Sequence, residues 1–170
     1  YSLGTQKAWE VLNWLTKYDS IRFGTFYTLS AENLSRTGIE LKVLFKIFEK
    51  ELDKIKSRQV LFDHDIKLKF IGRKELFPKK LQEKISNAQE LTADHKNKTI
   101  FLALGYNGQQ EIVDAAKKIA LDHKNGLDLK ELDEKKFKKY LYSELIEPDL
   151  IVRTGDTQRL SGFLTYQSAY

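Results

Sequence analysis

Three short apolar runs, separated by segments with helical spacing, constrain the fold of this 170-residue chain more than any other feature. The runs lie at 21–29, 66–71 and 99–104, and all three contain β-branched or aromatic residues. Parallel strands need long crossover connections, which are usually helices, so this alternation is typical of a parallel sheet. The sequence therefore predicts an α/β fold, with a mostly parallel β-sheet flanked by helices on both faces.

The segments between these runs carry apolar residues at every third or fourth position, which predicts helices. The predicted helices cover about residues 5–17, 44–55, 78–91, 112–119 and 130–142. A further apolar run, Leu150 to Val152, follows Pro148 and predicts a last strand buried in the sheet. We find no repeat, linker or low-complexity tract, so residues 1–170 are interpreted as a single domain.

The charge pattern narrows the class of partner. The net charge is +5, but lysines alternate with acidic residues along the predicted helices, as expected for solvated faces and not for a nucleic-acid surface. The modest excess suits an anionic small molecule or an anionic membrane surface. No apolar run reaches the about 20 residues of a membrane span. We therefore expect a cytoplasmic protein that either stays in solution or associates peripherally with a membrane.

Several kinds of site are excluded by what the sequence lacks. It contains no cysteine, which removes disulfides, thiolate nucleophiles and thiolate metal sites. Its three histidines, His64, His95 and His123, are scattered and show no metal-ligand spacing. Neither a Walker-type loop nor a Gly-x-Gly-x-x-Gly motif occurs. The sequence also begins at Tyr1 and has no methionine, and we interpret it as a trimmed sequence.

A polar turn with two arginines follows the predicted last strand. Arg153, Arg159 and Ser161 lie within nine residues of one another. The planar guanidinium fork matches phosphate oxygens, and ligands of open α/β sheets bind beyond the carboxyl ends of strands. The turn is therefore a candidate cradle for a phosphate or diphosphate. The alternative, which the spacing leaves open, is a surface loop with two solvated arginines.

A second polar loop, residues 30–40, follows the run at 21–29. It concentrates Ser30, Glu32, Asn33 and Arg36 in a few positions. One interpretation is structural, with Ser35 or Thr37 capping the next helix. The other is a substrate-binding loop, and the residues alone favour neither.

Residues 153–170 resemble the C-terminal signature of the cis-prenyltransferases, the undecaprenyl diphosphate synthase family. The shared features are two arginines around a turn, Leu-Ser, an aromatic residue and a Gln-Ser-Ala-Tyr run. Glu32-Asn33 and Arg36 are similar to the family motif Ser-x-Glu-Asn-Trp-x-Arg-Pro, although Leu34 and Thr37 replace its tryptophan and proline. Residues 105–112 resemble a third family turn, which we interpret as architectural. The resemblance covers nearly the whole chain.

The resemblance implies a fold with a hydrophobic tunnel and a prenyl-transferring activity. The expected reaction joins isopentenyl diphosphate to an allylic prenyl diphosphate of the farnesyl or geranylgeranyl type, giving a cis-polyprenyl diphosphate. The family assigns proton removal to the asparagine that matches Asn33. A neutral amide is a weak base, so we interpret Asn33 as positioning the diphosphate or a water molecule. The implied substrate-binding residues are Ser30, Ala31, Glu32, Arg36, Arg153, Arg159, Leu160 and Ser161.

The family also implies Mg²⁺ as cofactor and a homodimer. Its metal ligands are an aspartate expected upstream of Tyr1 and a glutamate expected after Tyr170, so no metal ligand is assigned in residues 1–170. Either these carboxylates lie outside the sequence or the protein is an inactive relative. The rival function is accordingly a non-catalytic partner subunit, and a third is an unrelated α/β protein that binds nucleotides or sugar phosphates.

Overall fold

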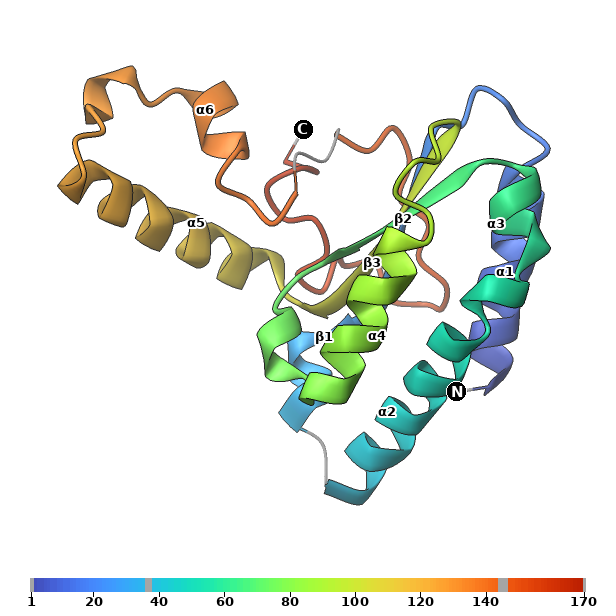
Figure 1. Cartoon of the computed structure of the whole chain (residues 1–170). Coiled ribbons are helices and arrows are strands. Elements are labelled where there is room, and N and C mark those ends of the chain that lie inside the picture. Colours follow the sequence, from blue (N-terminus) through green and yellow to red (C-terminus); the bar gives the residue numbers. More distant parts are fainter. Residues whose placement is uncertain (1, 36–37, 144–146, 170) are drawn as a thin grey trace. The chain divides into compact units, whose positions relative to one another are not determined.

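A computed structural model describes residues 2–35, 38–143 and 147–169 of the chain. It divides the chain into two compact units, Tyr1–Gly105 and Tyr106–Tyr170 (Figure 1). The prediction of a single domain stays a prediction. No helix within the described ranges combines the length and the hydrophobicity that a membrane span requires.

The first unit contains a three-stranded sheet with the order β1-β3-β2. The strands are β1 (Phe23–Ser30), β2 (Ile66–Ile71) and β3 (Lys98–Tyr106). Strands β2 and β3 pair in parallel, from Ile66 opposite Lys98 to Ile71 opposite Ala103. On the other side, the Thr99 N–H donates to the Arg22 carbonyl and the Thr28 hydroxyl donates to the Ala103 carbonyl. Residue numbers therefore rise in the same direction in β1 and β3, which makes these two strands parallel as well. The predicted parallel α/β sheet is confirmed.

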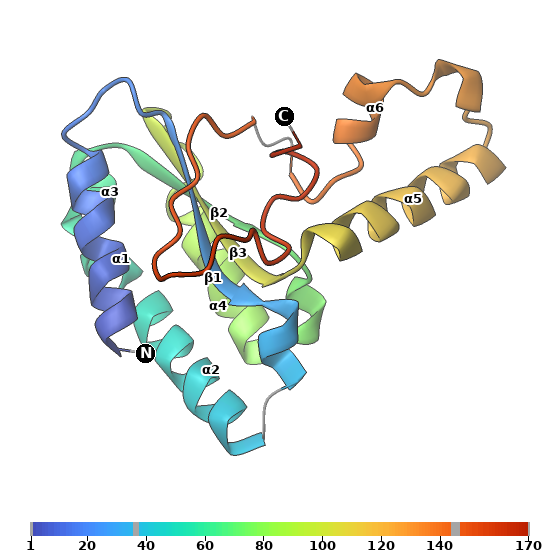
Figure 2. The same ribbon diagram turned by 180° about the vertical axis from the view of Figure 1, so that it is seen from behind.

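Among the described residues of this unit, four α-helices and three short 3-10 helices accompany the sheet. Figures 1 and 2 show the helices and the sheet from opposite sides. The helices are α1 (Ser2–Leu15), η1 (Ala31–Ser35), α2 (Gly38–Asp53), η2 (Ile55–Ser57), α3 (Gln59–Asp63), η3 (Lys74–Leu76) and α4 (Lys79–Glu90). Pro78 directly precedes α4, where its missing N–H costs no helical hydrogen bond.

One hydrophobic core joins these helices to the sheet. Leu12, Leu44, Leu61 and Leu81 enter it from α1 to α4 in turn, and Leu104 enters it from β3. Leu61, Leu81 and Leu104 have no exposed surface. Burying each such side chain is worth about 1.5–3 kcal/mol. The core therefore fixes the helices of this unit on the strands whose ends carry the polar loops.

The second unit begins with α5 (Gly108–Lys124), followed by η4 (Leu129–Glu131) and α6 (Glu134–Lys138). A single helix was predicted over 130–142, and the structure has two short ones instead. The reason is Asp133, which has an extended backbone and whose side-chain carboxylate caps α6 by accepting the Lys136 N–H. A residue in that conformation ends one helix and begins another.

The predicted last strand is wrong. Residues 149–152 have no strand conformation, and Leu150 and Val152 are 78% and 80% exposed. An apolar run becomes a strand only where a neighbouring chain pairs its N–H and C=O groups. The amino-acid composition identifies the apolar run but does not show whether another strand pairs with it.

Gly108, the first residue of α5, lies in very close contact with the C-terminal segment of the same unit. Its N–H donates to the Gly162 carbonyl at 2.7 Å. A β-carbon at this position would lie 2.4 Å from the Thr165 hydroxyl oxygen and 2.8 Å from the Thr165 backbone nitrogen. Only glycine leaves room for this approach.

We therefore expect Gly108→Ala to destabilise the second unit by about 1–3 kcal/mol through steric displacement of Thr165. Urea unfolding measures the loss, and faster amide hydrogen exchange along α5 localises it. The matched control is Gly4→Ala in α1, where a β-carbon meets nothing within 4 Å. That change should leave stability equal or higher, by up to about 1 kcal/mol. Equal effects of the two substitutions would contradict the packing argument.

Candidate functional site

The loop predicted to bind substrate folds as η1, directly after β1. The Asn33 N–H donates to the Ser30 hydroxyl oxygen at 3.3 Å, and the Ser35 hydroxyl donates to the Glu32 carbonyl at 2.7 Å. A serine that accepts a backbone N–H three residues on stabilises the start of a helical turn. Glu32 is exposed, whereas Ala31 and Asn33 are half-buried. The structure therefore holds these predicted site residues in one short turn, but Arg36 and Thr37 lie outside the described residues.

Leu34 anchors this turn to the first unit. Its side chain packs against the hydrophobic core. Its Cδ1 lies 3.4 Å from the point that a β-carbon on Gly105 would occupy. Gly105 has a φ of +56° in β3, a conformation that suits glycine. Leu34 thus serves as a packing residue, where the family motif has tryptophan.

Arg153 and Ser161, eight residues apart, are brought together in the second unit. The Arg153 Nη1 donates to the Ser161 hydroxyl oxygen at 2.8 Å and to the Arg159 carbonyl at 2.6 Å. The turn between them relies on Gly155, with a φ of +94°. The side chains of Arg153, Arg159, Leu160 and Ser161 are all exposed. Arg153 therefore closes the loop on itself, and the Arg159 side chain extends from the closed loop toward solvent.

The two groups of predicted residues belong to different units. Ser30, Ala31, Glu32 and Asn33 belong to Tyr1–Gly105, whereas Arg153 to Ser161 belong to Tyr106–Tyr170. That they form one reaction centre stays a prediction.

A buried carboxylate supports the loop of the second unit, and the sequence analysis did not identify it. Glu111 has no exposed surface. It accepts hydrogen bonds from the Tyr106 hydroxyl at 2.6 Å, the Tyr142 N–H at 2.9 Å and the Gln167 side-chain amide at 3.2 Å. These bonds join the start of α5 to the residues that follow Ser161. One feature of the sequence could have identified Glu111: it lies four residues before Ala115, so it places a carboxylate on the apolar face of the predicted helix.

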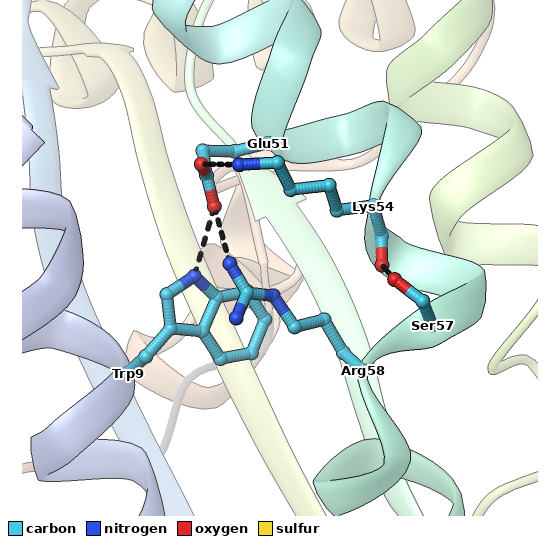
Figure 3. Close-up of polar contacts among 5 residues, drawn as sticks. All are labelled: Trp9, Glu51, Lys54, Ser57 and Arg58. Atoms are coloured by element: carbon cyan, nitrogen blue, oxygen red, sulfur yellow. Dashed lines mark hydrogen bonds and ion pairs between the residues drawn. The ribbon is translucent and has the colours of Figure 1, made fainter.

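A second polar cluster joins α1 to the end of α2 and to the loop before α3 (Figure 3). Glu51 accepts the Trp9 indole N–H at 3.1 Å, the Arg58 guanidinium at 2.7 Å and the Lys54 ammonium at 3.0 Å. The Arg58 guanidinium also lies 4.3 Å from the centre of the Trp9 ring. Burial acts to raise the pKa of Glu51, but the hydrogen bonds from Lys54, Arg58 and Trp9 outweigh it and hold the pKa below its usual value.

The cluster borders a cavity of about 380 Å³ between α1 and α2, whose wall also includes Ile47 and Lys50. Because the carboxylate is matched by two cations and an indole donor, the cluster has the composition of a structural clamp. We assign it to the packing of α1 and not to substrate chemistry.

The described residues do not form a metal site. Across residues 2–35, 38–143 and 147–169, no three His, Cys, Asp or Glu side chains lie close enough together to hold a metal ion. The residues present therefore do not fit Mg²⁺ by themselves, and no chemical step is assigned to it.

Comparison with known proteins gives consistent matches. The family described as putative undecaprenyl diphosphate synthase matches residues 1–170. A tritrans,polycis-undecaprenyl-diphosphate synthase (geranylgeranyl-diphosphate specific) of Thermoplasma acidophilum is 39% identical over 169 residues, which are 98% of this chain and 65% of that protein. The protein of the same name from Pyrococcus horikoshii is 37% identical, with 98% of this chain and 64% of the relative covered. The chain thus spans just under two thirds of the length of these relatives.

Solved structures agree with these matches. A probable undecaprenyl diphosphate synthase from Campylobacter jejuni has a TM-score of 0.76 at 27% identity, covering 88% of this chain and 69% of its own. Lavandulyl diphosphate synthase from Lavandula x intermedia, in complex with dimethylallyl diphosphate, has a TM-score of 0.79 at 32% identity. That match covers 87% of this chain and 64% of the lavender protein.

The Glu111 network generates a stability prediction. In Glu111→Gln an amide NH₂ replaces one of the two carboxylate oxygens. This NH₂ group cannot accept the hydrogen bonds that Glu111 accepts, so at least one buried donor loses its partner. We expect a loss of about 1–3 kcal/mol, measured by urea unfolding. Glu134→Gln, an exposed change in α6, is the control and should alter stability by less than about 0.5 kcal/mol. If both variants unfold at the wild-type urea concentration, Glu111 is not the support described above.

Proposed function

Because the chain belongs to the undecaprenyl diphosphate synthase family, we propose that the protein is a cis-prenyltransferase. It condenses isopentenyl diphosphate with an allylic prenyl diphosphate and releases a cis-polyprenyl diphosphate. The single observation that carries the proposal is the family match over all of residues 1–170. Glu32, Asn33, Arg153, Arg159 and Ser161 are present at the motif positions, which argues against a non-catalytic partner subunit.

The allylic substrate that we propose is geranylgeranyl diphosphate. The relatives from Thermoplasma acidophilum and Pyrococcus horikoshii carry this specificity in their names, at 39% and 37% identity. Farnesyl diphosphate, the other candidate, is the comparison substrate.

The loop of the second unit is suited to hold isopentenyl diphosphate. Arg159 contributes an exposed guanidinium, and the Ser161 hydroxyl lies next to Arg153. Charge-assisted hydrogen bonds from a preformed loop can hold a diphosphate without a change in the conformation of the loop. Leu160, between Arg159 and Ser161, would contribute through its backbone. The proposed role of this loop is to hold the homoallylic substrate in one orientation for the reaction.

The η1 turn is suited to the allylic diphosphate. We propose that Ser30, Ala31 and Arg36 contact this group and that the Asn33 amide orients one of its oxygens or a water molecule. Loss of diphosphate from the allylic carbon leaves a cation, which the double bond of isopentenyl diphosphate attacks. A proton then leaves the new cation to give the product. Glu32 is exposed in the same turn, where its negative charge would stabilise the allylic cation.

Four further features belong to the proposal. They are Mg²⁺ as the cofactor, a homodimer, a cytoplasmic location with peripheral membrane association, and a hydrophobic tunnel for the growing prenyl chain.

The direct test is a radiolabelled isopentenyl diphosphate assay with the full-length protein and Mg²⁺. Geranylgeranyl and farnesyl diphosphates are supplied in separate reactions, and product length is determined by chromatography. We expect label in a long prenyl product, with faster incorporation from geranylgeranyl diphosphate. No incorporation from either primer would contradict the enzyme and favour the partner subunit.

Arg159→Ala should raise the KM for isopentenyl diphosphate by about 10-fold to 150-fold, because one charge-assisted contact is worth about 1.5–3 kcal/mol. Arg159→Lys keeps the positive charge but loses the two-pronged guanidinium geometry. Its KM for isopentenyl diphosphate should lie between those of the wild type and Arg159→Ala. The thermal midpoint should not change, since the side chain is exposed. Lys124→Ala, an exposed cation at the end of α5, is the control for net charge. An unchanged KM in Arg159→Ala would remove this residue from the site.

A further inference from the structure

We propose that one exposed side of α2 rests on an anionic lipid membrane. We call this side the outer face of α2, and it consists of Ile39, Lys42, Val43, Lys46 and Lys50. The choice of partner rests on the proposed function, because prenyl diphosphates are amphiphiles that enter lipid bilayers. Peripheral membrane association thereby acquires a defined surface and a defined lipid charge.

The five residues of the outer face share one side of the helix. Intervals of four, three and four residues return to the same side of an α-helix, and they separate Ile39, Val43, Lys46 and Lys50, with Lys42 beside this row. All five residues are exposed, and Ile39 and Val43 are 80% and 49% exposed. Leu44, by contrast, is buried in the core of the first unit. The outer face therefore points away from that core.

The charges of α2 are distributed unevenly around the helix. Three of its four acidic residues form ion pairs with basic side chains outside α2: Glu49 with Lys80, Glu51 with Lys54 and Arg58, and Asp53 with Lys84. Within the described ranges, the three lysines of the outer face form no ion pair. Glu40, the fourth acidic residue, lies in the first turn at the border of this face. The lysines thus give the face a charge of +3, or +2 with Glu40 included.

Both kinds of residue on the outer face suit a lipid surface. Lysines are attracted to anionic headgroups, and their flexible stems let the ammonium groups reach phosphates while apolar neighbours enter the boundary with the acyl chains. Ile39 and Val43 are such neighbours. A nucleic acid would also attract the lysines, but its phosphate backbone offers no apolar environment to Ile39. The combination therefore favours an anionic membrane.

The position of the outer face along the chain fits the proposed activity. Ile39 follows Ser35, the last residue of η1, by four residues. Four residues of chain span at most about 14 Å, so the outer face begins close to the turn that we assign to the allylic diphosphate. A protein that rests on this face would take geranylgeranyl diphosphate from the bilayer, and return the longer prenyl product to it, over a short distance.

Vesicle binding tests the proposal with the full-length protein. Vesicles of phosphatidylcholine alone are compared with vesicles that contain about one third phosphatidylglycerol, and bound protein is measured by cosedimentation. The outer-face variant is Lys42→Gln/Lys46→Gln/Lys50→Gln. Its matched control is Lys124→Gln/Lys130→Gln/Lys135→Gln, which removes the same charge from three exposed lysines of the second unit. The apolar variant is Ile39→Thr/Val43→Thr.

We expect the wild type to bind the neutral vesicles at least about tenfold more weakly than the anionic ones. One lysine near an anionic surface strengthens binding about fivefold, so the outer-face variant should bind the anionic vesicles about 100-fold more weakly. The control variant should stay within about threefold of the wild type, because salt screens charges that lie away from the membrane. The apolar variant should bind about tenfold more weakly and keep the salt dependence of the wild type.

Lysine acetylation by a water-soluble reagent locates the contact without any substitution. When anionic vesicles are present, Lys42, Lys46 and Lys50 should lose most of their reactivity. Lys124 and Lys135 should react as they do in free protein. This measurement decides the proposal even if the outer-face variant does not fold.

Three results would overturn the proposal: equal binding to the two kinds of vesicle, equal binding by the outer-face and control variants, or full reactivity of Lys42, Lys46 and Lys50 in vesicle-bound protein. Sedimentation velocity tests a second copy of the chain as the occupant. If the outer-face variant changes self-association but not vesicle binding, this face is a subunit interface and the proposal is wrong.

The binding assay also separates this proposal from the proposed function, because it needs no turnover. A protein that binds anionic vesicles but makes no prenyl product would contradict the enzyme and leave the membrane surface standing. A protein that makes the product but does not distinguish the two kinds of vesicle would contradict the membrane surface alone.

Discussion

The pairing of β3 on both of its edges is the interaction on which the first unit depends. Strand β3 is hydrogen-bonded to β2 along one side and to β1 along the other. Parallel strands place their carboxyl ends at the same edge of a sheet, so η1 after β1 and Gly105 near the end of β3 come close together. The packing of Leu34 near Gly105 is the direct result. The polar turn is therefore held by the sheet and by an apolar contact at its base.

The success of sequence reasoning differed between elements for physical reasons. The run at 66–71 coincides with β2 because its buried residues, Leu68 and Phe70, alternate with lysines. The run at 150–152 is also apolar but has no strand conformation, since pairing depends on a partner strand that composition does not encode. The helix predicted over 130–142 is interrupted at Asp133. The helical spacing of apolar residues continues through this position, but Asp133 caps a new helix there.

For the candidate site, the sequence predicted the residue types and their clustering but not their support. It identified Arg153 and Ser161, which the structure brings into contact. It missed Glu111, because a buried polar residue is recognisable only by the partners that surround it. Glu111 obtains its donors from residues 5 to 56 positions away. Such partners are separated in sequence and become neighbours only after folding.

The internal contacts of Arg153 have a consequence for how an anion would be held. Both contacts use one guanidinium nitrogen, Nη1, and neither involves Nη2 or Nε. A guanidinium can therefore keep its tether to the backbone while it turns another edge toward an incoming anion. Arg153 can then bind an anion without giving up the hydrogen bonds that keep the loop closed. An ammonium group at this position has its three donors on one nitrogen, so it has no second edge to present and the ligand would share that nitrogen with the loop.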